Sequence, residues 1–364
     1  MTHRDAPAGA GPRRRDYSLV GPDARAAVAS GLAAAAWYRT EIPRKVMKEL
    51  MQRSDSPAIR DTIIWLAAIA VSAGGSIHLW GSWWCAPFLI VYGVLYGSSS
   101  DSRWHECGHG TAFRTRWMND VIYEFASFMI LRNSVTWRWS HARHHTDTII
   151  VGRDVEISVP RPPNPWRIAM VFVGLPDAVI SMAALMRNAF GHLSPAEKDF
   201  IPATEHKRAM RIGQCHIAIY VATVALALYF QSWLPVVMIG LPRLYGAWHG
   251  ILTGLLQHGG LADNVTDHRL NSRTVLINPV SRFIYWNMNY HVEHHMFPMV
   301  PYHALPKLHA MIKDDLPAAN PSLWHGYAEM IPAILRQRRD PDYYLRRPLP
   351  LTARPYLDDS RSKA

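Results

Sequence analysis

Two long segments without Asp, Glu, Lys or Arg dominate the pattern of apolar and polar positions along the chain. The first covers residues 62–100, and the second covers residues 212–262 with Arg243 as its single charged residue. Each is about twice the roughly 20 residues that cross a bilayer, and each has a polar break containing Trp or Pro near its middle. Buried helices of a soluble protein do not account for such stretches. The pattern predicts an all-α membrane protein with four transmembrane helices in two hairpins, over about 62–80, 83–100, 212–230 and 234–256.

The basic residues lie outside the two predicted hairpins. Lys and Arg are frequent before the first hairpin, between the hairpins and after the second, whereas the two tight turns contain neither. Cytoplasmic segments of membrane proteins carry such an excess. We therefore expect both termini on the cytoplasmic side, together with a helical cap formed by residues 101–211 and 257–335. The formal net charge of +11 then reflects topology and attraction to anionic lipid headgroups, and we expect no nucleic-acid partner.

The segments around these helices complete the predicted organisation. The apolar stretch at 166–191 contains charged residues, among them Arg167 and Asp177, and is typical of an amphipathic helix at the membrane interface. The basic run at 13–15 loosely imitates a twin-arginine signal, but a solvated tail is the favoured interpretation. The predicted units are a flexible tail (1–23), interfacial helices (24–61), a membrane domain (62–335) and a C-terminal tail (336–364).

Histidine is unusually frequent in this chain, with 19 copies. Three clusters repeat spacings of three and four residues: HECGH at 105–109, HARHH at 141–145 and HVEHH at 291–295. These spacings place imidazoles on one face of a helix, where each buried neutral ring needs partners for both nitrogens. Imidazole is a ligand for Fe, Zn, Cu and Ni. The eight histidines are too many for one ion and suit two: His105, His109, His141, His144, His145, His291, His294 and His295.

His258 is a ninth candidate ligand. It follows the last apolar turn of the fourth predicted helix, as His105 follows the second. All nine histidines can then converge just outside the bilayer, above the four-helix stem. His249 lies deeper along the same helix and is predicted to pack or to line a substrate pocket. The three cysteines, an odd number in a long chain, do not form a disulfide scaffold.

The three clusters, in this order around two hairpins, resemble the histidine boxes of the integral-membrane fatty-acid desaturase and hydroxylase superfamily. The similarity covers roughly residues 61–312 and includes the flanking runs WRWSHARHHTDT and NMNYHVEHHMFP. The runs GRDVEI, QHGGLADNVTDHRLNSRT and MVPYHALPKLH are similar to a bacterial subgroup that includes desaturases of the rhizobitoxine pathway and oxygenases of rhizopine breakdown. Those enzymes act on small polar molecules.

The resemblance implies a non-haem centre of two iron ions that uses O2 to cleave an unactivated C–H bond. Loss of a second hydrogen gives a double bond, whereas transfer of oxygen gives an alcohol. We therefore expect a desaturase acting on a lipid, an acyl chain or a small amphiphilic, amino-acid-like molecule, with a hydroxylase as the alternative. The nine histidines are the implied ligands. The resemblance also implies a multi-pass protein of a bacterial inner membrane with its metal site on the cytoplasmic side.

Residues near the boxes are candidates for supporting roles. Arg143, Asp147 and Glu293 are predicted to orient ligand imidazoles from outside the first coordination sphere, and for Glu293 an orientation toward solvent is the alternative. Arg243 lies within the fourth predicted helix, about 22 Å along the helix from His258. We favour pairing with Asp or lipid headgroups for Arg243, and anchoring of a substrate carboxylate is the alternative.

The chain shows no sequence signature of an electron carrier. It has no His-Pro-Gly-Gly haem motif, no Cys-x-x-Cys pair and no Gly-x-Gly-x-x-Gly fingerprint. We therefore expect electrons from an external ferredoxin, Rieske ferredoxin or cytochrome b5 with its reductase. A basic cytoplasmic face suits an acidic ferredoxin.

Two other classes of protein compete with this interpretation. The residues from His105 to His109 also match the H-E-x-x-H pattern of zinc metalloproteases, with Glu106 as general base. That hypothesis leaves six clustered histidines unexplained. A metal transporter predicts ligands at mid-membrane depth, where this sequence has few histidines.

Overall fold

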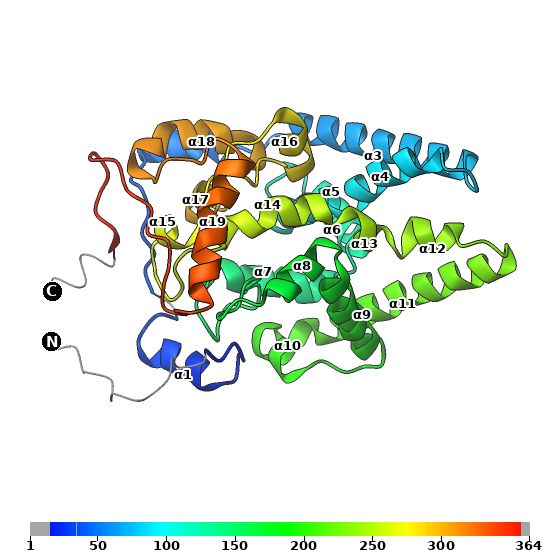
Figure 1. Ribbon diagram of the computed structural model, residues 1–364, viewed down its shortest axis with the longest axis horizontal. Coiled ribbons are helices and arrows are strands. Elements are labelled where there is room, and N and C mark those ends of the chain that lie inside the picture. Colours follow the sequence, from blue (N-terminus) through cyan, green and yellow to red (C-terminus); the bar gives the residue numbers. More distant parts are fainter. Residues whose placement is uncertain (1–14, 34, 358–364) are drawn as a thin grey trace.

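Helices form the regular structure of this protein. A computed structural model describes residues 15–33 and 35–357, and within these ranges only two isolated β-bridges accompany the helices. The prediction of an all-α protein is confirmed. Figure 1 shows an elongated molecule in which two helical hairpins project from one end, while α1 (Pro22–Ala29) and α18 (Leu305–Ile312) lie toward the other.

The first hairpin consists of α3 (Asp55–His78) and α4 (Cys85–Gly97), joined by a turn that exposes Trp83 and Trp84. The Trp65 indole donates a hydrogen bond of 2.9 Å to the Leu95 carbonyl, which ties the two helices together. After a break at Ser98 the chain continues as α5 (Ser99–Gly108), which carries the first histidine box. The hairpin thus leads directly into the candidate site.

The second hairpin has one continuous arm and one broken arm. The continuous arm is α11 (His206–Tyr229). The returning arm, predicted as one helix over 234–256, is divided into α12 (Leu234–Ile239), α13 (Pro242–Gly246) and α14 (Trp248–His258). Pro242 has no N–H to continue a helical hydrogen-bond ladder, which is consistent with a break at this point.

Side chains of α4 satisfy the carbonyl groups that this break leaves free. The Tyr92 hydroxyl donates to the Met238 carbonyl at 2.7 Å, and the Tyr96 hydroxyl donates to the Ile239 carbonyl at 3.1 Å. Ser98 donates through its hydroxyl to the Gly246 carbonyl at 2.5 Å. Unpaired backbone groups are costly in an apolar environment. The polar residues of α4 therefore stabilise the broken arm.

Helix α4 and the broken arm also touch through their backbones. A Cβ atom at Gly246 would lie 1.8 Å from the Gly93 carbonyl oxygen, so no side chain fits at this position. Small residues at a helix crossing allow such a close approach. This contact fixes where α13 ends, and therefore where α14 begins.

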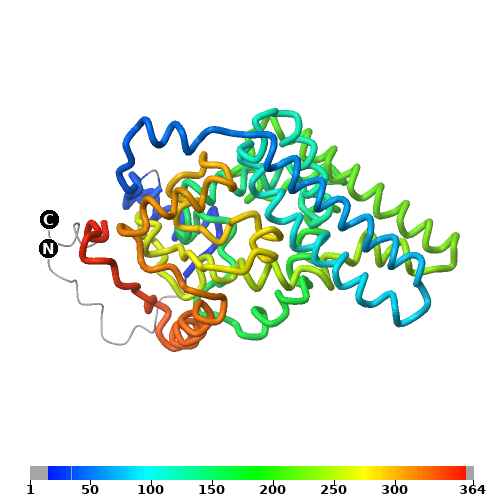
Figure 2. The backbone as a smooth tube through the Cα atoms, turned by 90° about the horizontal axis from the view of Figure 1, so that it is seen from above, coloured from blue at the N-terminus to red at the C-terminus, as the bar shows by residue number. Residues whose placement is uncertain are grey.

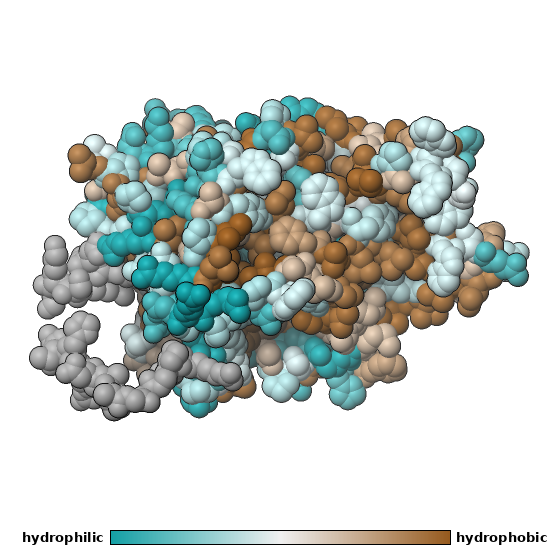
Figure 3. Space-filling view, in the orientation of Figure 1, coloured by the Kyte–Doolittle hydropathy of each residue, from teal (hydrophilic) through white to brown (hydrophobic). Residues whose placement is uncertain are grey.

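Two helical runs are individually long and apolar enough to cross a membrane among the described residues. They are Arg44–His78, which contains α3, and Ala203–Tyr229, which contains α11. A third candidate exists if α8 (Pro165–Phe172) and α9 (Leu175–Ala189) are taken as one bent span. Figure 3 shows apolar side chains gathered over the hairpin end of the molecule. The four-helix layout stays a prediction.

The apolar stretch at 166–191 is a bent pair of helices, where the sequence predicted a single amphipathic helix. α8 and α9 meet at 78°. Gly174 has φ +64°, and a Cβ there would lie 2.5 Å from the Arg243 carbonyl oxygen. Both conditions demand glycine, which places the corner of the bend directly on α13.

Arg243 forms a buried ion pair within the protein. Its guanidinium donates to the Asp177 carboxylate at 2.7 Å and 3.1 Å, and to the Gly97 carbonyl at 2.7 Å. Arg243 is only 3 % exposed. The favoured expectation of pairing with an aspartate agrees with this geometry, and the pair connects α9 to the hairpins.

The C-terminal segment packs against the body of the protein, which corrects the prediction of a loose tail as far as residue 357. The Arg347 guanidinium contacts Glu329, and the Tyr356 hydroxyl donates to the Arg347 carbonyl at 2.6 Å. At the other end of the chain, Arg15 pairs with Asp263 at 2.6 Å. Residues 1–14 and 358–364, the rest of the two predicted tails, lie outside the described residues.

The other helices form the compact end of the molecule around the histidine boxes (Figure 1). They are α2 (Arg44–Leu50), α6 (Arg116–Met129), α7 (Ser134–Thr146), α10 (Pro195–Phe200), α15 (His268–Asn271), α16 (Pro279–Tyr285), α17 (His291–Met296) and α19 (Leu323–Gln337), with short 3-10 turns at Ala203–Glu205, Tyr302–Ala304 and Lys313–Asp315. Their largest apolar core joins residues of α5 and α6 to residues of α17 and α18.

The Arg243–Asp177 pair allows a test of the packing between α9 and α13. Asp177→Asn leaves the Arg243 charge buried without its counter-ion, so we expect a loss of about 3 kcal/mol in unfolding free energy. Glu124→Gln, which breaks the exposed pair with Arg208, is the matched control and is expected to cost about 0–1 kcal/mol. Unfolding in detergent measures both. Equal losses in the two variants would contradict the assignment.

Candidate metal centre

The structure brings all nine candidate histidines together. Their ligand atoms form two groups, and within each group these atoms lie within 4.8 Å of one another. The first group is His105, His109, His141, His145 and His294, and the second is His144, His258, His291 and His295. Three clusters and one isolated histidine, separated by up to 190 residues in the sequence, thus form two groups that could each hold a metal ion.

Helix geometry explains how the boxes divide between the two groups. α7 begins at Ser134, where the Asn133 side chain accepts hydrogen bonds from two backbone amides of the first turn. From α7, His141 and His145 face the first group, and His144 faces the second. α17 divides its histidines in the same way. α5 with the residue after it serves only the first group, and α14 serves only the second.

The Nε2 atoms converge at the centre of each group. In the first group, Nε2 of His141 lies 3.1 Å from Nε2 of His109 and 3.2 Å from Nε2 of His145. In the second group, Nε2 of His291 lies 3.0 Å from Nε2 of His258 and 2.9 Å from Nε2 of His295. Imidazole nitrogens at these distances need a proton or a cation between them.

Hydrogen bonds at Nδ1 determine what the second group can bind. Nδ1 of His144 contacts Asp154 at 2.8 Å, and Nδ1 of His258 contacts the Asn271 carbonyl at 2.7 Å. These acceptors assign the proton to Nδ1 in both rings. In the neutral form of each ring, Nε2 then carries a lone pair.

The same assignment applies to His295. The Thr148 hydroxyl donates its proton to the His144 carbonyl at 2.7 Å, so its oxygen accepts from Nδ1 of His295 at 3.3 Å. The Nε2 lone pairs of His258 and His295 therefore both face Nε2 of His291, and one proton on His291 cannot satisfy them both. A cation coordinated by the four nitrogens does. The donor set fits a metal such as iron.

Glu156 plays the corresponding part in the first group. It accepts from Nδ1 of His141 at 3.1 Å and from the Ser140 hydroxyl at 2.8 Å. A carboxylate that accepts this proton fixes the orientation of the ring and raises its basicity as a ligand. Nδ1 of His105, His145 and His294 is buried without a hydrogen-bond partner. No hydrogen bond at Nδ1 therefore fixes which nitrogen of these three rings carries the proton, and each ring can present its Nε2 lone pair to a metal.

Burial keeps most of these imidazoles neutral. Desolvation lowers the pKa of His291, His294 and His295 well below the ordinary value, and neighbouring histidines lower it further. Desolvation also lowers the pKa of His144, but the Asp154 carboxylate outweighs it and raises this pKa to about 9. Neutral imidazole is the form that binds metal. A metal bound at His144 has to displace a proton from Nε2.

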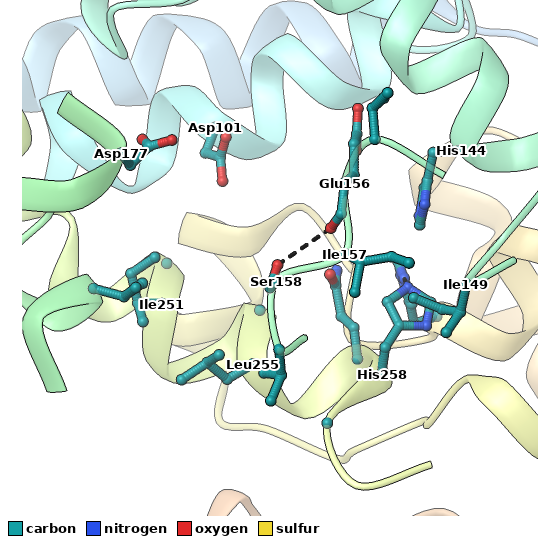
Figure 4. A pocket seen from close by; sticks show the side chains of 18 of the residues that line it. Asp101, His144, Ile149, Glu156, Ile157, Ser158, Asp177, Ile251, Leu255 and His258 are labelled. Atoms are coloured by element: carbon teal, nitrogen blue, oxygen red, sulfur yellow. Dashed lines mark hydrogen bonds between the residues drawn. The ribbon is translucent and has the colours of Figure 1, made fainter. Parts of the chain in front are cut away.

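A cavity of about 300 Å³ adjoins the two histidine groups. Figure 4 shows Glu156, His144 and His258 on one side of this cavity, Asp101 and Asp177 on another, and the apolar side chains of α14 below. Its wall comes from α5, α7, α8, α9 and α14, together with the loop 149–161. The polar residues of the wall include Arg132, which donates to Asp101 at 2.7 Å, and Arg243.

The comparison with known proteins decides the family. A family model described as fatty acid desaturase matches residues 80–327. The chain belongs to the fatty acid desaturase family. This membership makes it an oxidoreductase and excludes the zinc metalloprotease.

The curated relatives of this desaturase carry consistent names. The acyl-lipid omega-3 desaturase (cytochrome b5) of the endoplasmic reticulum of Arabidopsis thaliana is 26% identical over 73% of this chain and 72% of the relative. The sn-2 acyl-lipid omega-3 desaturase (ferredoxin) of Helianthus annuus is 26% identical over 73% of this chain and 63% of the relative. The sn-1 oleoyl-lipid 12-desaturase of Synechocystis is 28% identical over 35% of this chain and 34% of the relative.

The position of Glu106 agrees with the family assignment. Glu106 is fully buried and accepts hydrogen bonds from the Thr111 hydroxyl at 2.7 Å and from the Tyr302 amide at 3.0 Å. A general base of a zinc hydrolase would face a water molecule on the metal. Here Glu106 binds the backbone behind the metal centre and links α5 to the segment before α18.

Two of the three predicted supporting residues lie elsewhere in the desaturase. Arg143 contacts Asp199 at 3.2 Å at the surface, and Asp147 accepts from Arg153 at 3.0 Å. Neither hydrogen bonds a candidate ligand: Arg143 lies off the face of α7 that carries the histidines, and Asp147 follows the end of the helix. This corrects the prediction of their orienting role.

Glu293 is the third correction. It accepts from the Thr274 hydroxyl at 2.5 Å and contacts His309, so its carboxylate connects α17 to α18 and does not reach a ligand ring. His249, predicted to pack or line a pocket, packs through a contact of 3.0 Å with the Ser281 hydroxyl and is not part of the cavity wall.

Sequence reasoning missed Asp154 and Glu156 as the carboxylates that orient ligand rings. Both lie in an irregular loop after α7, where no helical spacing connects them to the boxes. The available signal was the run GRDVEI, in which two acidic residues follow the second box closely without the pattern of a helix.

The two aspartates near the second box allow a direct comparison. Asp154→Asn weakens the acceptor for His144, so we expect metal affinity to fall about 10- to 100-fold. Asp147→Asn changes only the contact with Arg153 and is expected to leave metal affinity unchanged. Competition between the purified protein and a chelator measures both affinities, and gel filtration checks the fold. A larger loss for Asp147→Asn would contradict the assignment.

Proposed function

We propose that this chain is a membrane desaturase that introduces a double bond into an acyl chain of a lipid, with two iron ions, O2 and electrons from a separate carrier. The observation that carries the proposal is the convergence of nine imidazoles into groups of five and four. Relatives that are named as acyl-lipid desaturases support the substrate class.

The donor sets suit two iron ions. Imidazole is a ligand of intermediate softness that binds Fe, and groups of five and four nitrogens leave coordination positions for O2 or water. When bound, the two ions would supply the reduction of O2 that drives removal of hydrogen from an unactivated C–H bond. In the balanced reaction, –CH2–CH2– loses two hydrogens, and O2 with two electrons and two protons gives two molecules of water.

The protein's own residues position this chemistry. Asp154, Glu156 and the Asn271 carbonyl hold three of the imidazoles through Nδ1, so their Nε2 atoms are aimed before metal binds. Ile251 and Leu255 present apolar surface to the cavity and exclude water from an alkyl chain beside the metal centre. The cavity touches ligands of both groups. A substrate chain in the cavity is therefore within reach of both ions.

We also propose the membrane arrangement. The two hairpins point in the same direction and lie side by side in both views of the backbone (Figures 1 and 2), which supports α3, α4, α11 and the arm α12–α14 as four crossings. The metal centre lies at the base of the hairpins. The excess of Lys and Arg in the segments outside the hairpins supports a cytoplasmic cap at an inner membrane.

The electron donor is a separate protein in this proposal. One relative is named for cytochrome b5 and another for ferredoxin. We propose a ferredoxin with its reductase, because the net charge of +11 favours encounter with an acidic carrier.

A polar, amphiphilic substrate is a second candidate, and the cavity wall favours it. The pairs Asp101–Arg132 and Asp177–Arg243 both line the cavity. An amino-acid-like molecule with an apolar part would find charged partners there, whereas a plain hydrocarbon end would not. Oxygen transfer in place of a second hydrogen removal would make the same site a hydroxylase.

A reconstituted assay tests the proposed function. We expect two irons per chain and, with O2, ferredoxin and reductase, a product 2 mass units lighter than an acyl lipid substrate. A product 16 mass units heavier would assign a hydroxylase, and turnover of amphiphiles alone would assign the second substrate class. Mass spectrometry and metal analysis give these readouts.

Variants that lack one candidate ligand distinguish loss of the metal site from loss of the fold. His144→Ala and His294→Ala are each expected to lower iron content and abolish the mass change, while the fold is retained. His325→Ala, at an exposed position of α19, is the control and is expected to keep both. Full activity of either ligand variant would overturn the assignment of the site.

A further inference from the structure

Gly254 is a helical glycine that the backbone does not require, and it differs from the exposed Gly74 of α3 because it lines a cavity. It lies within α14, four residues before His258, so the two residues share one face of the helix. Its φ is not in the left-handed region. A Cβ at this position would meet only the Tyr285 hydroxyl, at 3.8 Å. Gly246 differs, because there a Cβ would collide with the backbone of Gly93.

The missing side chain at Gly254 opens the cavity beside the metal centre. Gly254 lines the cavity together with its neighbours Ile251 and Leu255 and with the ligand His258. Glycine is less stable than alanine in the interior of a helix. Neither packing nor backbone conformation demands glycine here, and a larger side chain would occupy part of the cavity.

Tyr285 borders the same space and offers a hydrogen bond. It belongs to the end of α16, is 5 % exposed and also lines the cavity. Its hydroxyl is buried beside the side chains of Thr253 and Gln257, but it forms no hydrogen bond of ordinary geometry with them. Buried hydroxyl groups are normally paired, so this one is suited to a partner that arrives from the cavity.

We propose that Gly254 and Tyr285 form a subsite for the substrate beside His258. The notch at Gly254 takes the segment of the acyl chain that bears the carbonyl group, and the Tyr285 hydroxyl donates a hydrogen bond to the carbonyl oxygen. This proposal rests on the proposed function, because the carbonyl oxygen is the hydrogen-bond acceptor of an acyl chain. The subsite fixes the distance between the carbonyl group and the carbons that react.

A comparison of ester and ether lipids tests the hydrogen bond. Phosphatidylcholine with ester-linked chains has the carbonyl oxygen, and its ether-linked analogue lacks it. Tyr285→Phe is expected to weaken binding of the ester lipid about tenfold and to leave the ether lipid unaffected. Binding is measured by how well each unlabelled lipid inhibits crosslinking of a diazirine-labelled lipid to the full-length protein in nanodiscs. The measurement is made with and without metal. An equal loss for both lipids overturns the hydrogen bond.

A size series at Gly254 tests the notch. Gly254→Ala and Gly254→Leu are expected to lower crosslinking of an ester phosphatidylcholine whose diazirine lies near the carbonyl group, by about tenfold for leucine. Gly74 in α3 is the matched control, because it is exposed and a Cβ there meets nothing within 4 Å. Gly74→Ala and Gly74→Leu are expected to crosslink as the unchanged protein does.

The outcomes separate the subsite from the proposed function. If the unchanged protein crosslinks in this way but yields no lighter product from any acyl lipid, the proposed function fails while the subsite stands. If Gly254→Leu keeps its iron, its fold and the crosslinking of the unchanged protein, the subsite is wrong. A shifted double-bond position in the product of Gly254→Ala supports the subsite.

Discussion

The structure depends on the directed convergence of imidazole nitrogens. Each ring has two nitrogens, and a metal can use one only if the other is held elsewhere. Asp154, Glu156 and the Asn271 carbonyl hold Nδ1 of three rings, so that the Nε2 lone pairs meet. Lone pairs that face one another are unfavourable without a cation. The hydrogen bonds around α7 and α17 therefore hold the imidazoles in an arrangement suited to binding one. The two carboxylates and the carbonyl belong to the segments 147–157 and 258–274, which lie between the longer helices.

The hairpins solve a related problem for the backbone. The arm α12–α14 is broken twice, and each break frees carbonyl groups in apolar surroundings. Tyr92, Tyr96 and Ser98 of the first hairpin bind three of these carbonyls, and Arg243 of the broken arm binds the carbonyl of Gly97 in return. The two hairpins therefore stabilise each other through polar contacts. Because the arm is broken, α14 is short and has its own orientation, which brings His258 to the candidate metal centre.

The sequence predicted those features that repeat with the period of a helix. The eight box histidines and His258 were identified because spacing and position relative to apolar segments carry the information, and the structure places all nine together. The predicted supporting residues Arg143, Asp147 and Glu293 were chosen by nearness in sequence, and they have other partners. Asp154 and Glu156 reach their histidines through a loop, whose path depends on contacts with distant segments, as when Asn264 accepts from the Val151 amide.

Breaks in helices were predicted less well than helices themselves. The sequence predicted one helix over 234–256, but the division into three helices depends on the contact between Gly246 and Gly93, which joins two segments far apart in the chain. The bend of 78° between α8 and α9 likewise depends on Gly174 resting on the Arg243 carbonyl. The pattern within a single segment does not predict contacts of this kind with a distant segment.

These helix crossings in the stem also determine where the candidate ligands lie. The contact between Gly93 and Gly246 fixes the start of α14, which rises about 16 Å over its 11 residues before it delivers His258. Gly174 and Arg243 place the corner of α8 and α9 against α13, beside the cavity that Arg243, Ile251 and Leu255 line. Any change in the crossing would move His258 and the cavity wall together. Packing in the stem therefore sets the distance between the hairpin helices and the candidate ligands.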